Sequence, residues 1–219
     1  MSTTARGGPT LIVTADDYGY APGYDRGILD AVRAGAVDAV SAMVGRGSCR
    51  AEPLLETGIE IGLHLELADT ASGEIGDQVE RFERLFARPP AFLDGHHHCH
   101  ARDGVARDVA TLAAARRIPV RSVDARHRRL LHEAGVPTPD RLIGRLDPSE
   151  PVLPPLLAGG RTLPAGVTEW MVHPGYADPG SGSAYDKARE HDLDLLLRVA
   201  PSPGWGARRA PHAAALGVG

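Results

Sequence analysis

The sequence predicts a single α/β domain built on a parallel sheet, either open or closed into a barrel. Short apolar strands alternate with amphipathic helices along most of the 219 residues, and no linker divides the chain. Strands that alternate with helices favour parallel pairing, because each crossover returns the chain to the same end of the sheet. The length suits one large domain over residues 1–219 with a substantial buried core.

The first strand and helix follow from the pattern near the N-terminus. Residues 11–13 (LIV) form an apolar run that ends in the acidic motif TADDYG at residues 14–19. Apolar or small residues then recur at steps of three and four positions from Gly27 to Ala34, which indicates a helix, and Gly35 supplies a stop. Residues 39–44 (AVSAMV) form the next short strand.

The alternation continues towards the C-terminus. Further strands are predicted at 59–67, 91–96, 119–123 and 167–174, and helices at 74–87, 103–117 and 185–199. Residues 135–166 are rich in proline and glycine and are predicted to be loops with short strands. The tail from about residue 200 is expected to be frayed or loosely packed.

Charge and cysteine content exclude several classes of protein. The 24 Lys and Arg against 28 Asp and Glu give a net charge of −4, so we expect no nucleic acid or anionic membrane as partner. Cys49 and Cys99 are too few for a disulfide framework. No apolar segment has the length of a signal peptide or a membrane span. We therefore expect a soluble, cytoplasmic protein.

Polar residues gather where the predicted strands end, which is where active sites of parallel α/β folds lie. Each group has an ordinary alternative. The Asp pair could be a turn or a helix cap, a lone His in a strand is often a hydrogen-bonded core residue, and a His-rich tract can bind metal incidentally at a surface. The groups are Asp16 with Asp17, His64, Asp94 with His96–His100, and His173.

Their conjunction favours a metal site over these alternatives. One Asp and two His form a facial ligand set for a divalent ion, with open positions for water and substrate. One carboxylate of the Asp16–Asp17 pair could then bind the metal while the other accepts a proton from the activated water. A bound cation would also offset the repulsion between the two adjacent carboxylates.

Strand geometry predicts where the side chains of the HHHCH tract at residues 96–100 point. Side chains alternate along a strand, so His96, His98 and His100 are expected on one side and His97 and Cys99 on the other. Only part of the cluster can then face one site. Cys99 is predicted to be a small apolar filler rather than a ligand.

These motifs, in this order, resemble the YdjC-like (ChbG/HpnK) family of carbohydrate deacetylases. The matching segments are LIVTADDYG, GILDAVRAGAVDAVSAMV, IGLHLEL, FLDGHHHCH and TEWMVHPGY. The resemblance implies a deformed (β/α) TIM-like barrel, one divalent metal ion, either Mg²⁺ or Zn²⁺, and removal of acetyl groups from N-acetylated sugars. The short stretch between His64 and Asp94, and the tail after Val199, depart from the family pattern.

The resemblance also implies a role for each site residue. It makes Asp17, His64 and His96 the metal ligands, Asp16 the catalytic base and His173 the general acid. Asp94, His98 and His100 would orient ligands or contact the substrate.

The sequence thus predicts a hydrolase that removes acetyl groups from N-acetylated sugars or glycan-like substrates by metal-activated water. Two alternatives stay open: another metal-dependent ester or phosphoester hydrolase on the same scaffold, and a non-catalytic sugar- or metal-binding protein. The expected partner is a small N-acetylated sugar. A homodimer is left open as the assembly.

Overall fold

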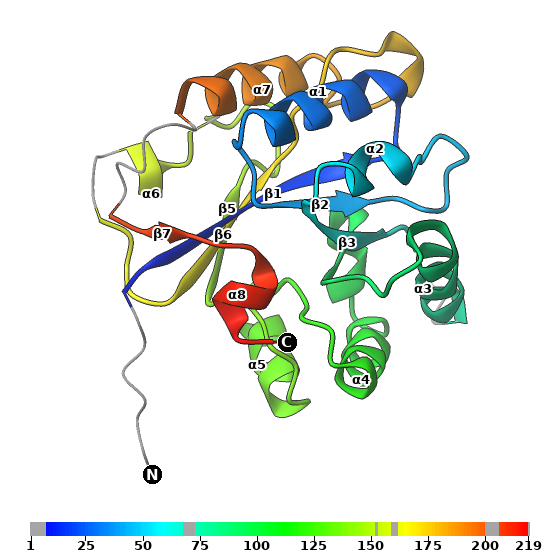
Figure 1. The fold of residues 1–219 in the computed structure, drawn as a ribbon. Coiled ribbons are helices and arrows are strands. Elements are labelled where there is room, and N and C mark those ends of the chain that lie inside the picture. The colour runs from blue at the N-terminus through cyan, green and yellow to red at the C-terminus, as the bar shows by residue number, and fades with distance from the viewer. Residues whose placement is uncertain (1–7, 68–72, 152, 159–161, 200–205, 219) are drawn as a thin grey trace.

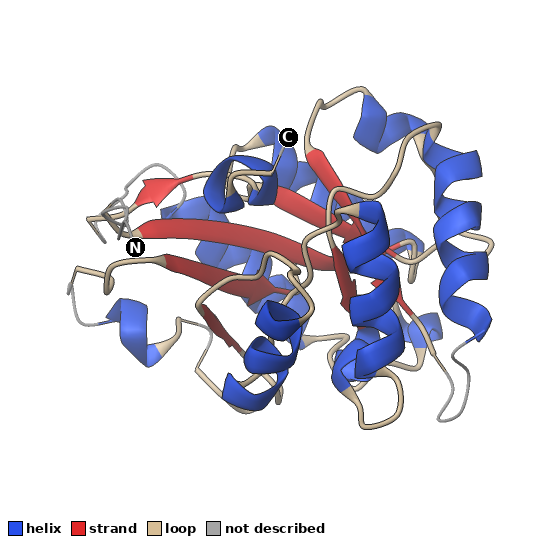
Figure 2. Cartoon of the chain, turned by 90° about the horizontal axis from the view of Figure 1, so that it is seen from below, coloured by secondary structure: helices blue, strands red, loops and turns tan. Residues whose placement is uncertain are grey.

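The computed structural model describes residues 8–67, 73–151, 153–158, 162–199 and 206–218 and has the predicted α/β architecture. Its strands are all parallel and form a curled half-barrel with helices packed around it (Figures 1 and 2). The strand order is β4-β3-β2-β1-β6-β5, and β7 pairs with β1. The predicted barrel-like fold class is therefore confirmed.

The elements follow the predicted alternation closely. The strands are β1 (Thr10–Tyr18), β2 (Ala39–Ala42), β3 (Glu60–Leu65), β4 (Leu93–Gly95), β5 (Arg141–Gly144), β6 (Val167–Val172) and β7 (Arg208–Arg209). The helices are α1 (Pro22–Arg33), α2 (Glu52–Leu55), α3 (Gly73–Phe86), α4 (Ala106–Arg116), α5 (Ala125–Glu133), α6 (Pro155–Ala158), α7 (Ala188–Val199) and α8 (His212–Leu216). Two short 3₁₀ segments are η1 (His96–Ala101) and η2 (Pro179–Ser181).

The two faces of β1 lie in different surroundings. On β1, Leu11, Val13 and Ala15 belong to the apolar core shared with the surrounding helices. Because side chains alternate along a strand, Thr14 and Asp16 face the interior of the half-barrel instead, and both are fully buried. The interior is thus partly polar, which places charged groups below the carboxyl ends of the strands.

The prediction of a strand at 119–123 is wrong, because this segment does not form a regular strand. Val120 makes only an isolated parallel bridge with Leu93 of β4. Its backbone N–H donates to the Pro137 carbonyl at 3.0 Å, so this segment joins β4 to the chain leading into β5 without forming a ladder. Pro119 and Pro137 bracket this contact and lack N–H donors, which limits regular pairing here.

The expectation of a loosely packed tail is wrong for residues 206–218. Residues 208 and 209 pair with Thr10 and Leu11 of β1, and α8 follows beneath the strands (Figure 1). His212 at the start of α8 is completely buried. The remaining part of the tail, 200–205, lies outside the described residues. The fold of 206–218 depends on contacts with β1 and β3, which a local sequence pattern does not reveal.

Among the described residues, four short helices were not predicted: α2, α5, α6 and α8. The helices α2 and α5 are short, and Asp124 caps α5 by accepting a hydrogen bond from the His127 N–H at 2.7 Å. The described part of 135–166 has the short strand β5 among loops, in line with the prediction, and also the single turn α6, which was not predicted. None of the helices in the described part of the chain combines the length and apolar character needed to cross a membrane.

Candidate active site

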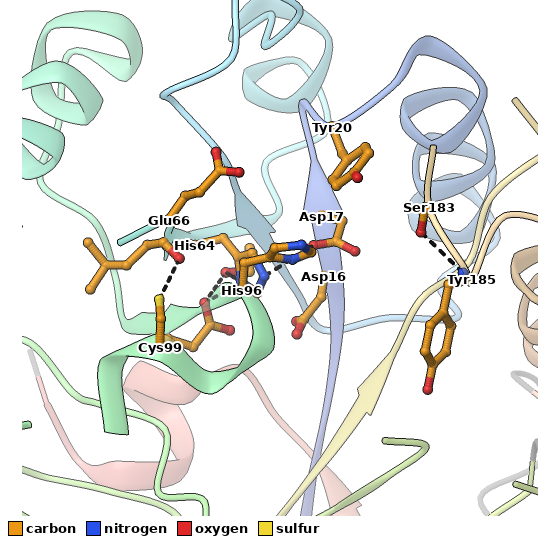
Figure 3. A network of polar contacts seen from close by, with 12 residues as sticks. Asp16, Asp17, Tyr20, His64, Glu66, His96, Cys99, Ser183 and Tyr185 are labelled. Carbon is orange, nitrogen blue, oxygen red and sulfur yellow. Dashed lines mark hydrogen bonds and ion pairs between the residues drawn. The ribbon is translucent and has the colours of Figure 1, made fainter. Parts of the chain in front are cut away.

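A pocket of about 260 Å³ opens at the carboxyl ends of the strands. Figure 3 shows part of its polar lining, with Asp16 and Asp17 at the end of β1 and His64 and His96 beside them. The polar side chains that line it are Asp16, Asp17, His64, His96, His97, His98, Arg145, His173, Ser183, Tyr185 and Arg189. The sequence-predicted residues Asp94 and His100 are not part of the lining.

The backbone of β1 explains how two consecutive carboxylates can share one pocket. In a regular strand Asp16 and Asp17 would point to opposite faces. Here the register with β2 shifts between Ala15 and Tyr18, and Asp17 has a φ of 73°. Asp tolerates this left-handed conformation better than most residues, although at some cost. The irregularity turns Asp17 into the pocket beside Asp16, and both side chains are 1% exposed.

Asp17, His64 and His96 converge on one point. The Asp17 Oδ1 atom lies 3.1 Å from His64 Nε2 and 3.0 Å from His96 Nδ1. One ligand atom from each residue lies within 4.8 Å of the others, so the three could hold a metal ion. This is the ligand set that the resemblance implied.

A second acidic group orients His64. Asp94 accepts a hydrogen bond from His64 Nδ1 at 2.8 Å and another from the Ser41 hydroxyl. Because Nδ1 is engaged, Nε2 is the ring nitrogen that faces Asp17. Burial alone would lower the pKa of His64, but the carboxylates around it raise the pKa well above its usual value. Asp94 thus fixes which nitrogen of His64 faces the pocket, and its role in the reaction stays a prediction.

A different grouping of ligands fits less well. Asp16, His64 and Asp94 also bring their ligand atoms within 4.8 Å of one another. However, Arg121 contacts both carboxylates, at 2.6 Å for Asp16 Oδ2 and 2.8 Å for Asp94 Oδ2, and Asp94 lies outside the pocket. The chemistry of the donor set therefore favours Asp17, His64 and His96.

The expected alternation in the histidine tract is wrong. The strand β4 ends at Gly95, and residues 96–101 form the 3₁₀ segment η1. His97 and His98 have φ values of 49° and 55°, so side chains do not alternate as they would in a strand. His96, His97 and His98 line the pocket, whereas His100 is buried behind it and donates from Nε2 to the Arg121 carbonyl at 3.0 Å.

Arg121 holds Asp16 in a two-point contact. Its Nη1 and Nη2 groups lie 2.6 Å and 2.8 Å from the two carboxylate oxygens of Asp16. The same guanidinium donates from Nε and Nη2 to Glu169 Oε1, at 3.0 Å and 2.8 Å. Burial raises the pKa of Asp16 to about 6, although Arg121 opposes this shift. A carboxylate with such a pKa is well suited to accept a proton near neutrality.

Arg189 of α7 forms a buried ion pair with Asp17. Its Nη2 atom lies 2.5 Å from Asp17 Oδ2, which leaves Oδ1 directed at the two histidines. Burial alone would raise the pKa of Asp17, but Arg189 and hydrogen bonds from His64 and His96 hold it well below its usual value. Asp17 is therefore ionised at neutral pH.

His173 lies across the pocket at the end of β6. Its backbone N–H donates to Asp192 Oδ2 at 2.9 Å, and its ring lies 5.0 Å from the Tyr185 ring, centroid to centroid. Burial lowers the pKa of His173 to about 3, and Arg189 contributes to the same shift. The resting ring is therefore neutral, with one nitrogen to donate and one to accept a hydrogen bond.

The sequence argument missed Glu169 and two buried arginines that contact the Asp pair, Arg121 and Arg189. Arg189 lies 172 residues from its partner Asp17, so no local spacing connects them. Arg121 and Glu169 did carry a signal, because each is a charged residue within an apolar stretch, PVRSV and VTEWMV. A buried charge needs a partner, and these two segments could have been paired on that ground.

We expect the stability of the fold to fall in mild acid because of His100. Burial lowers the pKa of His100 to about 3, whereas a His in the unfolded chain titrates near 6.5. Between these values the unfolded state binds more protons, so the stabilising effect is complete above pH 6.5 and is lost as the pH falls. This group should remove about 2 kcal/mol between pH 7.5 and pH 5.

Urea unfolding followed by circular dichroism at both pH values measures the change. His100→Gln, which keeps a side-chain amide donor but does not titrate, should show a smaller decline than the parent. Equal pH dependence in the two proteins would contradict the assignment.

Comparison with known proteins agrees with the motifs. A family model described as YdjC-like protein matches residues 10–73 and 68–200. A chitooligosaccharide deacetylase of Serratia marcescens is 29% identical over 227 residues, covering 85% of this chain and 90% of the relative. A chitooligosaccharide deacetylase of Yersinia pestis (strain Pestoides F) is 29% identical over 147 residues, covering 51% of this chain and 58% of that one.

A solved structure supports the fold. It is a protein of Enterococcus faecalis V583 whose description names cellobiose-phosphate cleavage, and it superposes with a TM-score of 0.75 at 20% identity. The superposition covers 95% of this chain and 99% of that one. The family model itself covers far more than half of the sequence, from residue 10 to residue 200. The chain belongs to the YdjC-like protein family.

Proposed function

We propose that this protein is a metal-dependent carbohydrate deacetylase that hydrolyses the acetamide group of an N-acetylated sugar. The observation that carries the proposal is the convergence of Asp17, His64 and His96 beside Asp16 in one pocket. The names of the Serratia and Yersinia relatives support chitooligosaccharide-like substrates. The family membership supports a deacetylase over the other hydrolases that such a site could serve.

The residues present fit a divalent metal ion. One carboxylate oxygen and two imidazole nitrogens face one another, and the other atoms of these groups are held by partners: Asp17 Oδ2 by Arg189 and His64 Nδ1 by Asp94. Such second contacts are typical of metal ligands, because they fix which atom binds. Two imidazoles suit Zn²⁺, and the carboxylate also suits Mg²⁺.

Bound there, a divalent ion would polarise the acetyl carbonyl and lower the pKa of water from about 15.7 towards 7. Proton energetics explain why the reaction needs this help. Transfer of a proton from free water to Asp16, whose pKa is about 6, is uphill by roughly 10 units, or about 13 kcal/mol. Asp16 alone is therefore too weak a base for unactivated water.

In this mechanism Asp16 accepts the proton of the attacking water. The two-point contact with Arg121 fixes the plane of the Asp16 carboxylate, and each carboxylate oxygen keeps a further lone pair for the incoming proton. Asp16 lines the pocket next to Asp17, so the base lies beside the three proposed ligands. Preorganisation of this kind avoids reorientation during the reaction.

His173 is the proposed general acid for the departing amine. Because its resting ring is neutral, His173 would take up, through solvent in the pocket, the proton that Asp16 removes from water, and pass it to the amine nitrogen as the C–N bond breaks. Asp16 then ends ionised and His173 neutral, so the cycle closes. Its place in the pocket lining, opposite the histidines of η1, suits a group that meets the leaving side of the substrate. Of the remaining histidines, His98 is proposed to contact the substrate and His100 to support Arg121 from behind.

The cellular setting is part of the proposal. Cys49 and Cys99 are both free and buried thiols. Their state suits the reducing cytoplasm, where we propose that the enzyme meets a small N-acetylated sugar.

Acetate release from a panel of N-acetylated sugars, including short chitooligosaccharides, tests the function. We expect release that stops after treatment with a chelator and returns when Zn²⁺ or Mg²⁺ is added. Matched acetate esters and phosphoesters are assayed alongside. Turnover of the esters or phosphoesters alone would favour the other hydrolases. Sugar or metal binding without any turnover would favour a binding protein.

We expect His96→Ala and His64→Ala to weaken metal binding by at least about a hundredfold, because loss of a supporting contact alone often costs ten- to a hundredfold. Elemental analysis after dialysis, and titration with Zn²⁺, measure the loss. His98→Ala is the matched control, since His98 lines the same pocket outside the proposed ligand set. Normal binding by His96→Ala with loss in His98→Ala would reassign the ligand.

A further inference from the structure

The C-terminal segment 206–218 lies beyond the family match, which ends at residue 200. It nevertheless contributes a buried side chain to the interior of the half-barrel. Its strand β7 pairs with the start of β1, and α8 then brings His212 against residues of β3 and β6 (Figure 1). This is the end of the barrel opposite the pocket.

The position of His212 is closely fixed. Its ring stacks on Phe92, with 3.8 Å between centroids and an interplanar angle of 15°. Phe92 in turn lies over Gly62, where a Cβ atom would come within 2.4 Å of the ring. Glu60 accepts from His212 Nδ1 at 2.9 Å and from the His212 backbone N–H at 2.6 Å. The ring is held from several sides and is completely buried.

The other ring nitrogen of His212 faces the network that holds the proposed base. His212 Nε2 lies 3.4 Å from Glu169 Oε1. The same oxygen of Glu169 accepts from Arg121, and Arg121 contacts both oxygens of Asp16. A continuous line of charged contacts thus runs from the tail through the barrel interior to Asp16.

Several buried carboxylates compete for the guanidinium of Arg121, so the contact between His212 and Glu169 matters. Asp16, Asp94 and Glu169 all lie within 2.8 Å of Arg121, and all four side chains are buried. Asp94 also accepts from His64 and Ser41, so Asp16 and Glu169 are the carboxylates that compete for this one cation. A buried charge without a partner is costly. Between them, Glu169 and Glu60 raise the pKa of His212 to about 9, although burial alone would lower it. A protonated His212 is therefore a second cation on the Glu169 side.

We propose that His212 is a positioning residue, which by pairing with Glu169 keeps the Arg121 guanidinium in its two-point contact with Asp16. Without this cation, Glu169 would draw Arg121 towards itself, and the Asp16 carboxylate would lose its orientation. The inference rests on the proposed function of Asp16 as the base. It makes a tail outside the family match part of the support for the active site.

His212→Phe is the main test, because Phe keeps an aromatic ring that can stack on Phe92 and the backbone N–H bond to Glu60, but has no ring N–H and no charge. We expect kcat for acetate release to fall about tenfold or more with little change in KM, since small misplacements of a reacting group cost this much. Thermal melting by circular dichroism reports stability separately. Arg208→Ala, an exposed change on the same tail, should leave kcat and KM unchanged. A stability loss with unchanged kcat would reduce His212 to a structural role.

A double-mutant cycle tests the route through Glu169. If His212 acts through that carboxylate, adding His212→Phe to Glu169→Gln should lower kcat by much less than it does in the parent. Additive losses in kcat would refute the route.

A measurement on the unmodified protein is independent of how the variants fold and of whether acetate is released. ¹⁵N NMR of the histidine rings should show His212 doubly protonated at pH 7.5. A neutral ring would overturn the proposal even if the enzyme is a deacetylase. Failure of the parent to release acetate would instead refute the proposed function.

Discussion

Arg121→Met should destabilise the fold by about 3–5 kcal/mol, the cost typical of leaving a buried charge without its partner. The side chain is 0% exposed and contacts Asp16, Asp94 and Glu169. Met has similar length and apolar character but no charge, so the variant isolates the loss of the cation. Since whole domains are stable by only about 5–15 kcal/mol, much of the stability would be lost.

The direction in which the destabilisation of Arg121→Met changes with pH shows whether the lost positive charge causes it. In the variant the buried carboxylates lose their main counter-ion, so their pKa values rise above those of the unfolded chain. The destabilisation should therefore shrink as the pH falls and the carboxylates become protonated. Urea unfolding at pH 7 and pH 5 measures this recovery.

Arg126→Met is the matched control. Arg126 pairs with Asp103, but the two side chains are 75% and 79% exposed. Surface pairs of this kind contribute little, so the change should stay within about 1 kcal/mol. Equal effects at the two arginines would show that the buried network has no special role in stability.

The parallel fold and the site residues at strand ends could be predicted for one physical reason. Local periodicity identifies strands and helices, and in a parallel sheet the carboxyl ends of all strands lie at one edge. This rule grouped the Asp pair, His64, the histidine tract and His173 at one edge although they are far apart in the sequence. The family resemblance then singled out Asp17, His64 and His96 among them. To apply this rule one needs only the order of strands and helices along the chain, and no knowledge of their contacts.

The rest of the site depends on geometry that periodicity does not encode. The left-handed backbone at Asp17, His97 and His98 changes where these side chains point, and it replaced the expected alternation with a 3₁₀ segment. The pairing of Arg121 with Asp16 spans 105 residues, and that of Arg189 with Asp17 spans 172. A sequence shows that a charge is buried in an apolar strand, but the partner follows only from the fold.

Replacing each carboxylate of the TADDYG motif, Asp16 and Asp17, by Asn should impair the enzyme in different ways. We expect Asp16→Asn to keep its metal, because Asp17, His64 and His96 are intact, but to lose the proton acceptor. General-base assistance is typically worth 10²- to 10⁴-fold, or roughly 3–5.5 kcal/mol of barrier. The value of kcat should therefore fall at least about a hundredfold, with KM changed far less.

Asp17→Asn provides the internal control, since Asn tolerates the positive φ at this position about as well as Asp does. The neutral amide is a weaker ligand, so metal should be lost first and activity should partly return at high Zn²⁺ or Mg²⁺. Metal content after dialysis and kcat against added metal distinguish the two variants. If Asp16→Asn loses its metal while Asp17→Asn retains it, the two roles are reversed. If Asp16→Asn is fully active, Asp16 is not the base, and the Arg121 contact then serves the stability of the interior alone.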